Sequence, residues 1–376
     1  MTSVTETEGA AVDRILTIAA QFAQKGRVAT AQEFGQGNVN DTYLVTLDSG
    51  EAPFVLQRIN THVFRQPELV MRNMRTFTEH VRQRQRTDVL CAERRWDVPQ
   101  VLLTQSQQDH WLESDGTVWR AISFIDAAQS FDTIQSLDHA REVGYGLGMF
   151  HHLISDLPSE QLADTLEGFH ITPRYLQQYE SVLEQNSMGS SPEVNYCRAF
   201  ICDRTSLAHT LETAKAKGLL PLRLMHGDPK INNIMIDAVT GQAVSLIDLD
   251  TVKPGLVHYD IGDCLRSSCN PLGEETDQWE SVCFDLDLSQ AVLQGYLSVA
   301  RSFLTPTDYD YLFDAIRLIA FELGLRFFTD YLMGDRYFKT QYPDHNLARA
   351  LVQFKLTESI EAQERSLKAI IQDLRR

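Results

Sequence analysis

The sequence predicts an α+β fold of two lobes, a small β-rich lobe followed by a larger and mainly helical one. In the first third of the chain, short runs with strand-like patterns flank one stretch of helical spacing. After Asp126 the hydrophobic residues recur mostly at helical spacing, and a single hairpin pattern interrupts them. We therefore expect an N-terminal lobe over residues 1–125 and a C-terminal lobe over residues 126–376.

The N-terminal lobe begins with a helical pattern over residues 10–24, which ends at Lys25-Gly26. A second helix is expected over residues 67–84, where Pro67 suits the first turn because a helix needs no N–H donor there. Strands are predicted over residues 39–45, 54–59, 98–104 and 117–125. The lobe is thus expected to be a sheet with one inserted helix.

The C-terminal lobe is expected to be helical except for one hairpin. Two strand-like runs, residues 233–237 and 243–247, flank the turn Val239-Thr240-Gly241-Gln242. Helices are predicted over residues 137–153, 173–184 and 192–217, with several more from residue 286 onward. A small β-rich lobe, a larger helical lobe and one hairpin near their junction form the layout of a protein-kinase-like fold.

The overall charge disfavours two classes of partner. The chain has 376 residues, of which 51 are acidic and 34 are basic, for a net charge of −17. Such a surface repels nucleic acid and anionic lipid, so we expect neither as a partner. The polar, acidic start of the chain lacks a secretory signal pattern, and no apolar run reaches the roughly 20 residues of a membrane span. Six cysteines without metal-site spacing fit reduced thiols, so a cytoplasmic protein is expected.

The segment most informative about chemistry is residues 225–235. It contains His226, Asp228 and Asn233 in the H-x-D-x-x-x-x-N spacing of a kinase catalytic loop. An aspartate on a rigid loop can accept the proton of an attacking hydroxyl, so Asp228 is the expected catalytic base. Alone, a His-Gly-Asp sequence is more often a simple turn.

A second aspartate completes the motif. Asp248 follows Asp228 by twenty residues, after the predicted hairpin. Because a hairpin returns the chain to its starting point, Asn233 and Asp248 are expected at the same end. An amide oxygen and a carboxylate there are suitable ligands for Mg²⁺. The combination of loop, hairpin and second aspartate favours phosphoryl transfer.

These residues resemble the aminoglycoside phosphotransferase and choline kinase superfamily, and among its members most closely the N-acetylhexosamine 1-kinases. The resemblance extends from about Phe34 to about Phe328. It is carried by residues 37–43, 54–60, 119–120, 124–125, 227–233 and 247–255. It implies ATP and Mg²⁺ as cofactors, a nucleotide-binding N-terminal lobe, and a C-terminal lobe that holds the catalytic loop and a small-molecule substrate. The implied reaction is phosphorylation of the anomeric hydroxyl of an N-acetylhexosamine.

On the nucleotide side, the loop with Gly35, Gly37 and Asn38 is expected to cover the phosphates, although it lacks the third glycine of G-x-G-x-x-G. An ordinary hairpin turn is the alternative. Adenine is expected against backbone groups near Phe124 and Ile125.

The phosphate-binding cation departs from the usual pattern. The lysine expected on the next strand is missing, and Arg58 is the candidate that replaces it. If the predicted register of this strand is wrong by one residue, Gln57 and not Arg58 lies on the face toward the phosphates. Glu79 is the expected ion-pair partner of Arg58, with a solvent-facing glutamate as the alternative.

Four residues are candidates for substrate binding. Asp250 is either a second carboxylate of the metal site or an acceptor for a substrate hydroxyl, and Arg266 is expected where the substrate pocket opens. His170 and Arg174 lie in a stretch that resembles one of the hexosamine kinases, although Thr172 is also simply a good helix start.

Two further aspartates flank this region. Asp260 is expected to brace the catalytic loop, through a bond from His226 or from a loop amide, as the superfamily implies. Asp263 is either a helix cap or a residue of the substrate pocket.

Other functions remain open from the sequence alone. A kinase of the same fold that acts on homoserine, choline or another sugar is one, and a non-catalytic nucleotide-binding module is another. A metal-dependent hydrolase could use the same acidic residues without a nucleotide. A role in aminoglycoside inactivation fits less well, although an acidic surface would attract a cationic drug.

Overall fold

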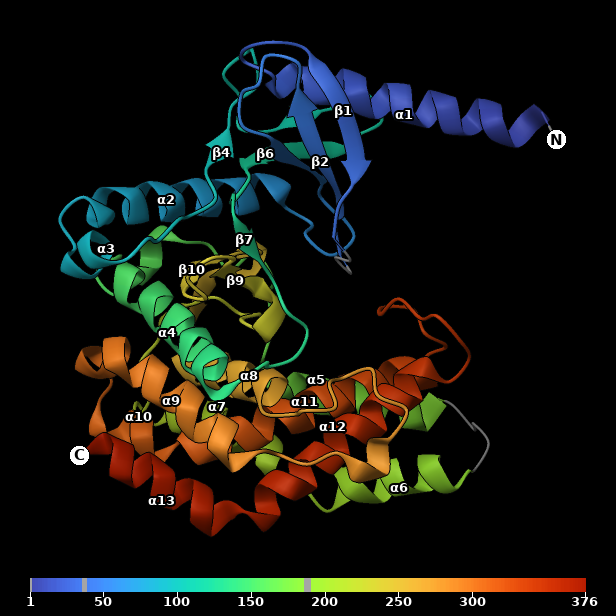
Figure 1. The fold of residues 1–376 in the computed structure, drawn as a ribbon. Helices are drawn as coiled ribbons and strands as arrows, with labels where there is room; N and C mark the ends of the chain where they lie inside the picture. Colours follow the sequence, from blue (N-terminus) through green and yellow to red (C-terminus); the bar gives the residue numbers. More distant parts are fainter. Residues whose placement is uncertain (1, 36–38, 186–190) are drawn as a thin grey trace. The chain divides into compact units, whose positions relative to one another are not determined.

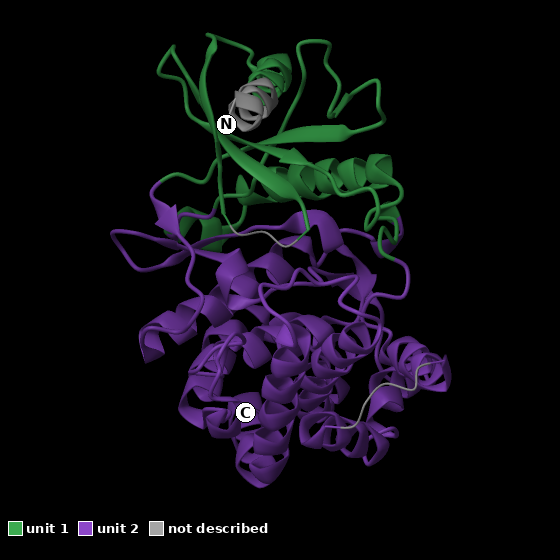
Figure 2. Ribbon diagram, turned by 90° about the vertical axis from the view of Figure 1, so that its right-hand side faces the viewer, with its two compact units in different colours: residues 1–93, 97–126, 161–166 green, residues 94–96, 127–160, 167–376 purple. Residues whose placement is uncertain are grey.

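The fold is described from a computed structural model, which describes residues 2–35, 39–185 and 191–376 (Figure 1). The chain forms two compact units (Figure 2). The first comprises residues 1–93, 97–126 and 161–166, and the second comprises residues 94–96, 127–160 and 167–376. A sheet dominates the first unit and helices dominate the second, so the predicted α+β class is confirmed.

The first unit is built on one antiparallel sheet with the order β1-β2-β3-β6-β4, in which β5 also pairs with β6. The strands are β1 (Val28–Glu33), β2 (Asp41–Leu47), β3 (Phe54–Arg58), β4 (Val101–Leu102), β5 (Trp111–Leu112) and β6 (Val118–Ser123). The strand predicted over residues 98–104 is reduced to the two residues of β4.

Helices cover both faces of this sheet. On one face, α1 (Thr2–Phe22) packs against Leu56 and Trp119. On the other face, α2 (Pro67–Gln85) packs against Ile59 and Val118, with Pro67 in its first turn as predicted; α3 (Val89–Glu93) follows it. Because successive side chains of a strand point to opposite faces, Gln57 and Arg58 lie on different sides of the sheet.

The second unit is a bundle of helices around the long, almost entirely buried α11, which runs beside α12 (Figure 1). The helices are α4 (Leu137–Ile154), α5 (Thr172–Gln185), α6 (Pro192–Cys202), α7 (Thr210–Ala216), α8 (Val257–Ser268), α9 (Leu286–Ala300), α10 (Pro306–Asp310), α11 (Leu312–Leu332), α12 (His345–Ala362) and α13 (Glu364–Arg375). The single helix predicted over residues 192–217 is wrong. A turn at 203–206 divides it, where Thr205 and Ser206 favour turns over helix.

Two glycines let α4 and α9 approach at backbone distance. A Cβ atom placed on Gly144 would lie 1.9 Å from the carbonyl oxygen of Val292. A Cβ on Gly295 would lie 1.9 Å from the carbonyl oxygen of Arg141. Only glycine fits at either position, so the close packing of α4 against α9 requires both residues.

The predicted hairpin is confirmed. β9 (Ile234–Asp237) pairs with β10 (Ala243–Leu246), and β7 (Ala128–Gln129) adds to its other edge. A separate pair joins β8 (Arg223–Met225) to β11 (Lys253–Gly255), so the segment between β8 and β9 is held at both ends. Among the described helices, none has the length and apolar character needed to cross a bilayer.

Candidate active site

The loop between β8 and β9 carries Asp228, and hydrogen bonds of the His226 side chain hold this loop in place. The buried His226 ring accepts a hydrogen bond at Nδ1 from the Asp228 amide at 3.2 Å. Its Nε2 donates to the carbonyl oxygen of Ile247 at 2.9 Å. Burial lowers the pKa of His226, which agrees with a neutral ring that uses one nitrogen as donor and the other as acceptor.

Asp260, at the start of α8, holds the same loop with both carboxylate oxygens. Oδ1 accepts from the Gly227 amide at 2.8 Å, and Oδ2 accepts from the His226 amide at 2.6 Å and from Nε2 of His151 at 2.8 Å. Burial alone would raise the pKa of Asp260, but these donors and the neighbouring imidazoles hold it below its usual value. The support expected from Asp260 is present, and His151 adds a donor that the sequence did not indicate.

Asp228 itself remains accessible, with 31 % of its side chain exposed. Nζ of Lys230 lies 3.2 Å from Oδ2 of Asp228. Nδ2 of Asn233 donates to the Asp228 carbonyl oxygen at 2.7 Å and lies 3.3 Å from its Oδ2. The charge of Asp228 is the main cause of the raised pKa of Lys230, so the two form a charged pair on the loop.

The hairpin brings Asn233 and Asp248 to the same end, as predicted. The Ile247 amide donates to the Asn233 carbonyl oxygen at 2.9 Å, which fixes the strand ends beside each other. Because Nδ2 of Asn233 is used by Asp228, Oδ1 is the Asn233 atom that suits a cation. Asp248 adopts a left-handed backbone, with φ of 63°, a costly conformation that is common at functional sites.

This pair of oxygen donors fits Mg²⁺, which prefers one or two protein ligands with the remainder from phosphate and water. No cluster of three or more His, Cys, Asp or Glu side chains that could hold a metal by itself occurs in residues 2–35, 39–185 and 191–376. With Asn233 and Asp248 as protein ligands, phosphate and water oxygens would supply the remaining ligands of Mg²⁺.

On the nucleotide side, only part of the predicted loop can be placed. Gly35 lies between β1 and β2 with φ of 75°, whereas Gly37 and Asn38 fall outside the described residues. Phe124 and Ile125 directly follow β6 at the end of the sheet. The Phe124 ring stands edge-on to Phe34, with 5.8 Å between centroids.

The expected ion pair between Arg58 and Glu79 is wrong. Arg58 pairs instead with Asp41, its cross-strand neighbour, and its side chain is 51 % exposed. Glu79 pairs with Arg75 on its own helix at 3.4 Å. The reason is strand alternation, since Arg58 shares the α1 face with Leu56 whereas α2 packs on the opposite face.

A different cation lies on the α2 face, one that the sequence analysis missed. Arg120 of β6 is directly opposite Gln57 and is only 1 % exposed. Its Nε and Nη2 donate to Oε1 of Gln57 at 2.9 and 2.7 Å. An arginine within the apolar run of β6 was the available signal.

His170 is a buried residue that contacts the catalytic loop. Its Nε2 donates to the carbonyl oxygen of Gly227 at 2.7 Å, and its Nδ1 bonds to Glu322 of α11 at 2.8 Å. Burial would lower the pKa of His170, but the charge of Glu322 outweighs it and raises the pKa. Glu322 also accepts from Thr172 at 2.6 Å. The structure thus places His170 as a buried tether between α11 and the loop.

The other substrate candidates are scattered. Arg174 is exposed and pairs with Glu167 at 3.1 Å, and the structure does not bring it to Asp228. Asp250 is buried in a short 3₁₀ turn, Leu249–Thr251. Arg266 is buried between Asp263 and Glu274. Of the four, His170 is the one for which a bond to the catalytic loop is established, through the carbonyl oxygen of Gly227.

Arg326 of α11 is a further cation that the sequence analysis missed. Three rings lie near its guanidinium, at 5.2 Å for Phe169, 5.0 Å for Tyr175 and 5.5 Å for Phe338. Burial opposes its charge, but nearby tyrosines and the carboxylates of Glu322 and Asp228 raise its pKa. Within the described ranges the guanidinium has no hydrogen-bond or ion-pair partner.

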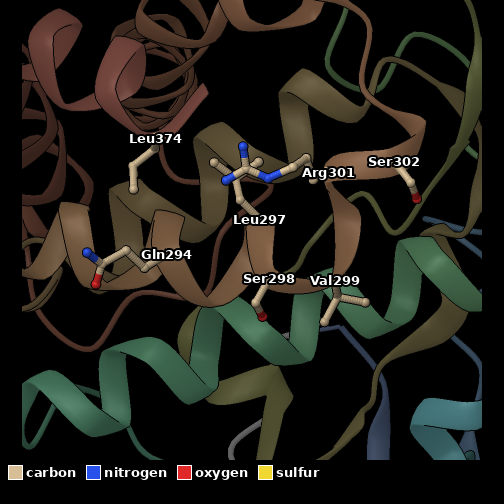
Figure 3. Close-up of a pocket in the computed structure, with 7 residues that line it drawn as sticks. All are labelled: Gln294, Leu297, Ser298, Val299, Arg301, Ser302 and Leu374. Carbon is tan, nitrogen blue, oxygen red and sulfur yellow. The ribbon is translucent and has the colours of Figure 1, made fainter. Parts of the chain in front are cut away.

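A surface pocket of about 520 Å³ lies elsewhere in the second unit (Figure 3). Leu297 and Val299 of α9, with Leu374 of α13, supply its apolar lining, and the side chain of Arg301 extends toward Leu297. None of the residues predicted to act in catalysis or binding lines it.

Comparison with known proteins gives one family and several similar structures. The sequence model of the Phosphotransferase enzyme family (APH) matches residues 30–280. An aminoglycoside phosphotransferase from Alicyclobacillus acidocaldarius has a TM-score of 0.62 at 16 % identity, covering 95 % of this chain and 96 % of that one. The microcompartment-associated aminopropanol kinase has a TM-score of 0.62 at 18 % identity, covering 94 % and 98 %. Choline kinase from Cryptosporidium parvum has a TM-score of 0.55 at 14 % identity, covering 92 % and 90 %. These likenesses confirm the protein-kinase-like fold.

Proposed function

Because the chain belongs to the Phosphotransferase enzyme family, we propose that it transfers the γ-phosphoryl group of ATP to a hydroxyl group of a small molecule. The observation that carries the proposal is the loop after β8, where both oxygens of Asp260 hold the backbone beneath Asp228. A rigid loop with an accessible carboxylate suits a base that must meet a hydroxyl in one fixed position.

In this proposal Asp228 accepts or orients the proton of the attacking hydroxyl. Nζ of Lys230 pairs with the Asp228 carboxylate, 3.2 Å from Oδ2. Asn233 orients the same carboxylate through Nδ2 and, with Asp248, would hold Mg²⁺. When bound, the metal ion supplies positive charge that neutralises the phosphate oxygens. Positioning by the protein then provides much of the rate, and a placed base contributes about 10²–10⁴-fold.

For the nucleotide, we propose the end of the sheet in the first unit. The turn at Gly35, together with Gly37 and Asn38, would cover the phosphates, and backbone groups at Phe124 and Ile125 would contact adenine. Arg58 is not favoured as the phosphate cation, because it lies on the α1 face with Asp41.

For the acceptor, we propose the anomeric hydroxyl of an N-acetylhexosamine. The support is the resemblance of residues 227–233 and 247–255 to the N-acetylhexosamine 1-kinases. The guanidinium of Arg326, which has no hydrogen-bond or ion-pair partner among the described residues, and its surrounding rings also suit a polar ring-shaped ligand. A small amino alcohol is the second candidate, because similar folds occur in an aminopropanol kinase and a choline kinase.

A substrate panel tests the proposal. ADP release is followed with ATP, Mg²⁺ and one of five acceptors: N-acetylglucosamine, N-acetylgalactosamine, choline, homoserine or 1-amino-2-propanol. We expect ADP release that depends on an N-acetylhexosamine and yields the sugar 1-phosphate. Release with an amino alcohol alone supports the second candidate. If no hydroxyl-bearing acceptor raises ADP release above the rate of ATP alone, the proposed function is wrong.

A further inference from the structure

Lys230 lies two residues after Asp228 on the catalytic loop, and hydrogen bonds hold its backbone on the C-terminal side. The Asn233 amide donates to the Lys230 carbonyl oxygen at 2.9 Å. The next amide, that of Ile231, donates to Oγ of Ser267 in α8 at 3.1 Å. The lysine side chain therefore extends from a segment of backbone that is fixed relative to α8.

The two carboxylate oxygens of Asp228 have different surroundings. Nζ of Lys230 lies 3.2 Å from Oδ2, and Nδ2 of Asn233 lies 3.3 Å from the same oxygen. Oδ1 has no hydrogen-bond partner among the described residues, although the side chain is partly exposed. Oδ1 is therefore the oxygen that suits the proton of an acceptor hydroxyl, while Lys230 contacts the other oxygen of the same base.

The ammonium group of Lys230 has more donors than its contacts use. An ammonium group carries three N–H donors, and one of them serves Asp228. In residues 2–35, 39–185 and 191–376 this group has no second hydrogen-bond or ion-pair partner, and its side chain is 31 % exposed. The charge of Asp228 raises the pKa of Lys230 against the effect of burial, so the group carries its positive charge at neutral pH.

Two other candidate cations are bound to carboxylates elsewhere. Arg58 pairs with Asp41 on the α1 face of the sheet. Arg266 donates to two carboxylates of the second unit, at 2.8 and 2.7 Å. Of these three cations, Lys230 is the one whose contact with Asp228 is established.

The geometry of phosphoryl transfer brings the γ-phosphorus close to this ammonium group. A general base lies about 2.6–3.2 Å from the oxygen whose proton it accepts. Reacting atoms lie about 3–3.5 Å apart before the bond forms, so the phosphorus comes within roughly 7 Å of Oδ1 of Asp228. Nζ of Lys230 is 3.2 Å from the other oxygen of that carboxylate. Because lysine has a flexible four-carbon stem, its ammonium group can bridge the base and the phosphoryl oxygens.

We propose that Lys230 is a catalytic residue, which donates hydrogen bonds from its ammonium group to the γ-phosphoryl oxygens during the transfer. The proposal rests on the proposed function. In this step a bond forms between the acceptor oxygen and the γ-phosphorus, and the bond from that phosphorus to the bridging oxygen breaks, with its electron pair retained by ADP. The acceptor proton passes to Oδ1 of Asp228. Lys230 places positive charge beside oxygens that carry negative charge in the transition state.

The variants Lys230→Met and Lys230→Arg test the proposal with the best acceptor of the substrate panel. Methionine keeps an unbranched stem and removes the charge, whereas arginine keeps the charge. In Lys230→Met, kcat should fall by about 10²–10³-fold, as for the loss of one donor to a transition-state oxygen. The KM for the acceptor should stay within about 3-fold. Lys230→Arg should retain a kcat at least roughly 10-fold above that of Lys230→Met.

A second measurement separates this role from one in which Lys230 only orients Asp228. Affinity for ADP with Mg²⁺ is measured with and without aluminium fluoride, which mimics the transferring phosphoryl group. In Lys230→Met, the gain in affinity from fluoride should fall by at least roughly 10-fold, while affinity without fluoride stays within about 3-fold. The same loss should appear when Lys230→Met is added to Asp228→Asn, because that protein has no Asp228 carboxylate to orient.

Lys355→Met is the matched control. Lys355 of α12 pairs with Glu358 at 3.1 Å, and its side chain is 34 % exposed. It is thus a lysine of similar exposure in an ion pair of similar length, on an element outside the catalytic loop. This control should keep the wild-type kcat and the wild-type gain in affinity from fluoride.

A kcat within about 3-fold of wild type in Lys230→Met overturns the inference, and so does a gain from fluoride that persists in this variant. An equal loss in Lys355→Met also overturns it. Normal ADP affinity shows that each variant is folded. In all three cases the wild-type enzyme turns over its acceptor, so the proposed function stands. If no acceptor supports turnover in the wild-type enzyme, the proposed function itself has failed, and the inference fails with it.

Discussion

Two substitutions of Asp260, to asparagine and to alanine, should weaken the catalytic loop to different degrees. In Asp260→Asn, the carbonyl oxygen can still accept from the Gly227 amide, which places the NH₂ group against the His226 amide. His151 can adapt by changing tautomer, because its Nδ1 lies 3.0 Å from the Tyr296 hydroxyl, which can accept as well as donate. One buried backbone donor therefore loses its acceptor.

The number of backbone donors left without an acceptor determines the expected loss of unfolding free energy in each variant. A single unmet buried donor costs about 1–3 kcal/mol, which is the expected loss of unfolding free energy in Asp260→Asn. Asp260→Ala leaves the amides of His226 and Gly227 both unmet and removes the partner of His151. Its expected cost is roughly 2–6 kcal/mol, which is twice the cost of a single unmet buried donor. Against a typical stability of about 5–15 kcal/mol, the second variant should be only marginally folded.

Urea denaturation measures the two losses, and hydrogen exchange localises them. The amides of residues 226 and 227 should exchange faster in Asp260→Ala than in the wild-type protein, because their acceptor is gone. Turnover should fall in both variants as the loop loses its fixed position. Equal stability losses in the two variants, or amides at 226 and 227 that stay fully protected in Asp260→Ala, would refute this account of the loop.

Three further predictions concern the metal pair, a buried tether and a helix contact. Asp248→Ala should abolish the dependence of ATP affinity on Mg²⁺, measured by calorimetry with and without the metal; an unchanged dependence contradicts the assignment. His170→Asn, chosen because asparagine tolerates the φ of 61° at this position, should be less stable than the wild-type protein by about 3–5 kcal/mol at low pH. Since the pKa of His170 is raised above its usual 6.5, its stabilisation is complete below that value and is lost as the pH rises through the folded-state pKa; urea midpoints between pH 5 and 9 should converge, and a constant difference contradicts the prediction. Gly144→Ala should cost more than about 3 kcal/mol, because its Cβ would lie 1.9 Å from a backbone oxygen; a thermal midpoint near that of the wild-type protein contradicts the close contact.

The features that the sequence predicts well are encoded locally. The loop after β8 and the following hairpin lie within about 25 consecutive residues, so the spacing of Asp228, Asn233 and Asp248 determines their arrangement. The helix that begins at Pro67 is local for the same reason. These parts follow from turn residues and hydrophobic periodicity, and they need no knowledge of distant contacts.

The features that the sequence does not predict depend on pairing between distant segments. The face of Arg58 depends on strand register, because a shift of one residue exchanges it with Gln57. Arg120 meets Gln57 only after β3 and β6 pair, although 63 residues separate them along the chain. Oδ2 of Asp263, which has no hydrogen-bond partner among the described residues, is likewise not indicated by the sequence, since an aspartate three residues before an arginine on a helix normally indicates a satisfied pair.

Nucleotide binding and turnover measured together on Asp228→Asn test the central claim most directly. The variant keeps the size of the side chain but removes the carboxylate that accepts the proton. We predict that Asp228→Asn binds ATP with Mg²⁺ within about 3-fold of the wild-type affinity, while kcat with the best acceptor falls by about 10²–10⁴-fold. A variant that binds ATP normally and retains near-wild-type turnover would contradict the assignment of Asp228 as the catalytic base.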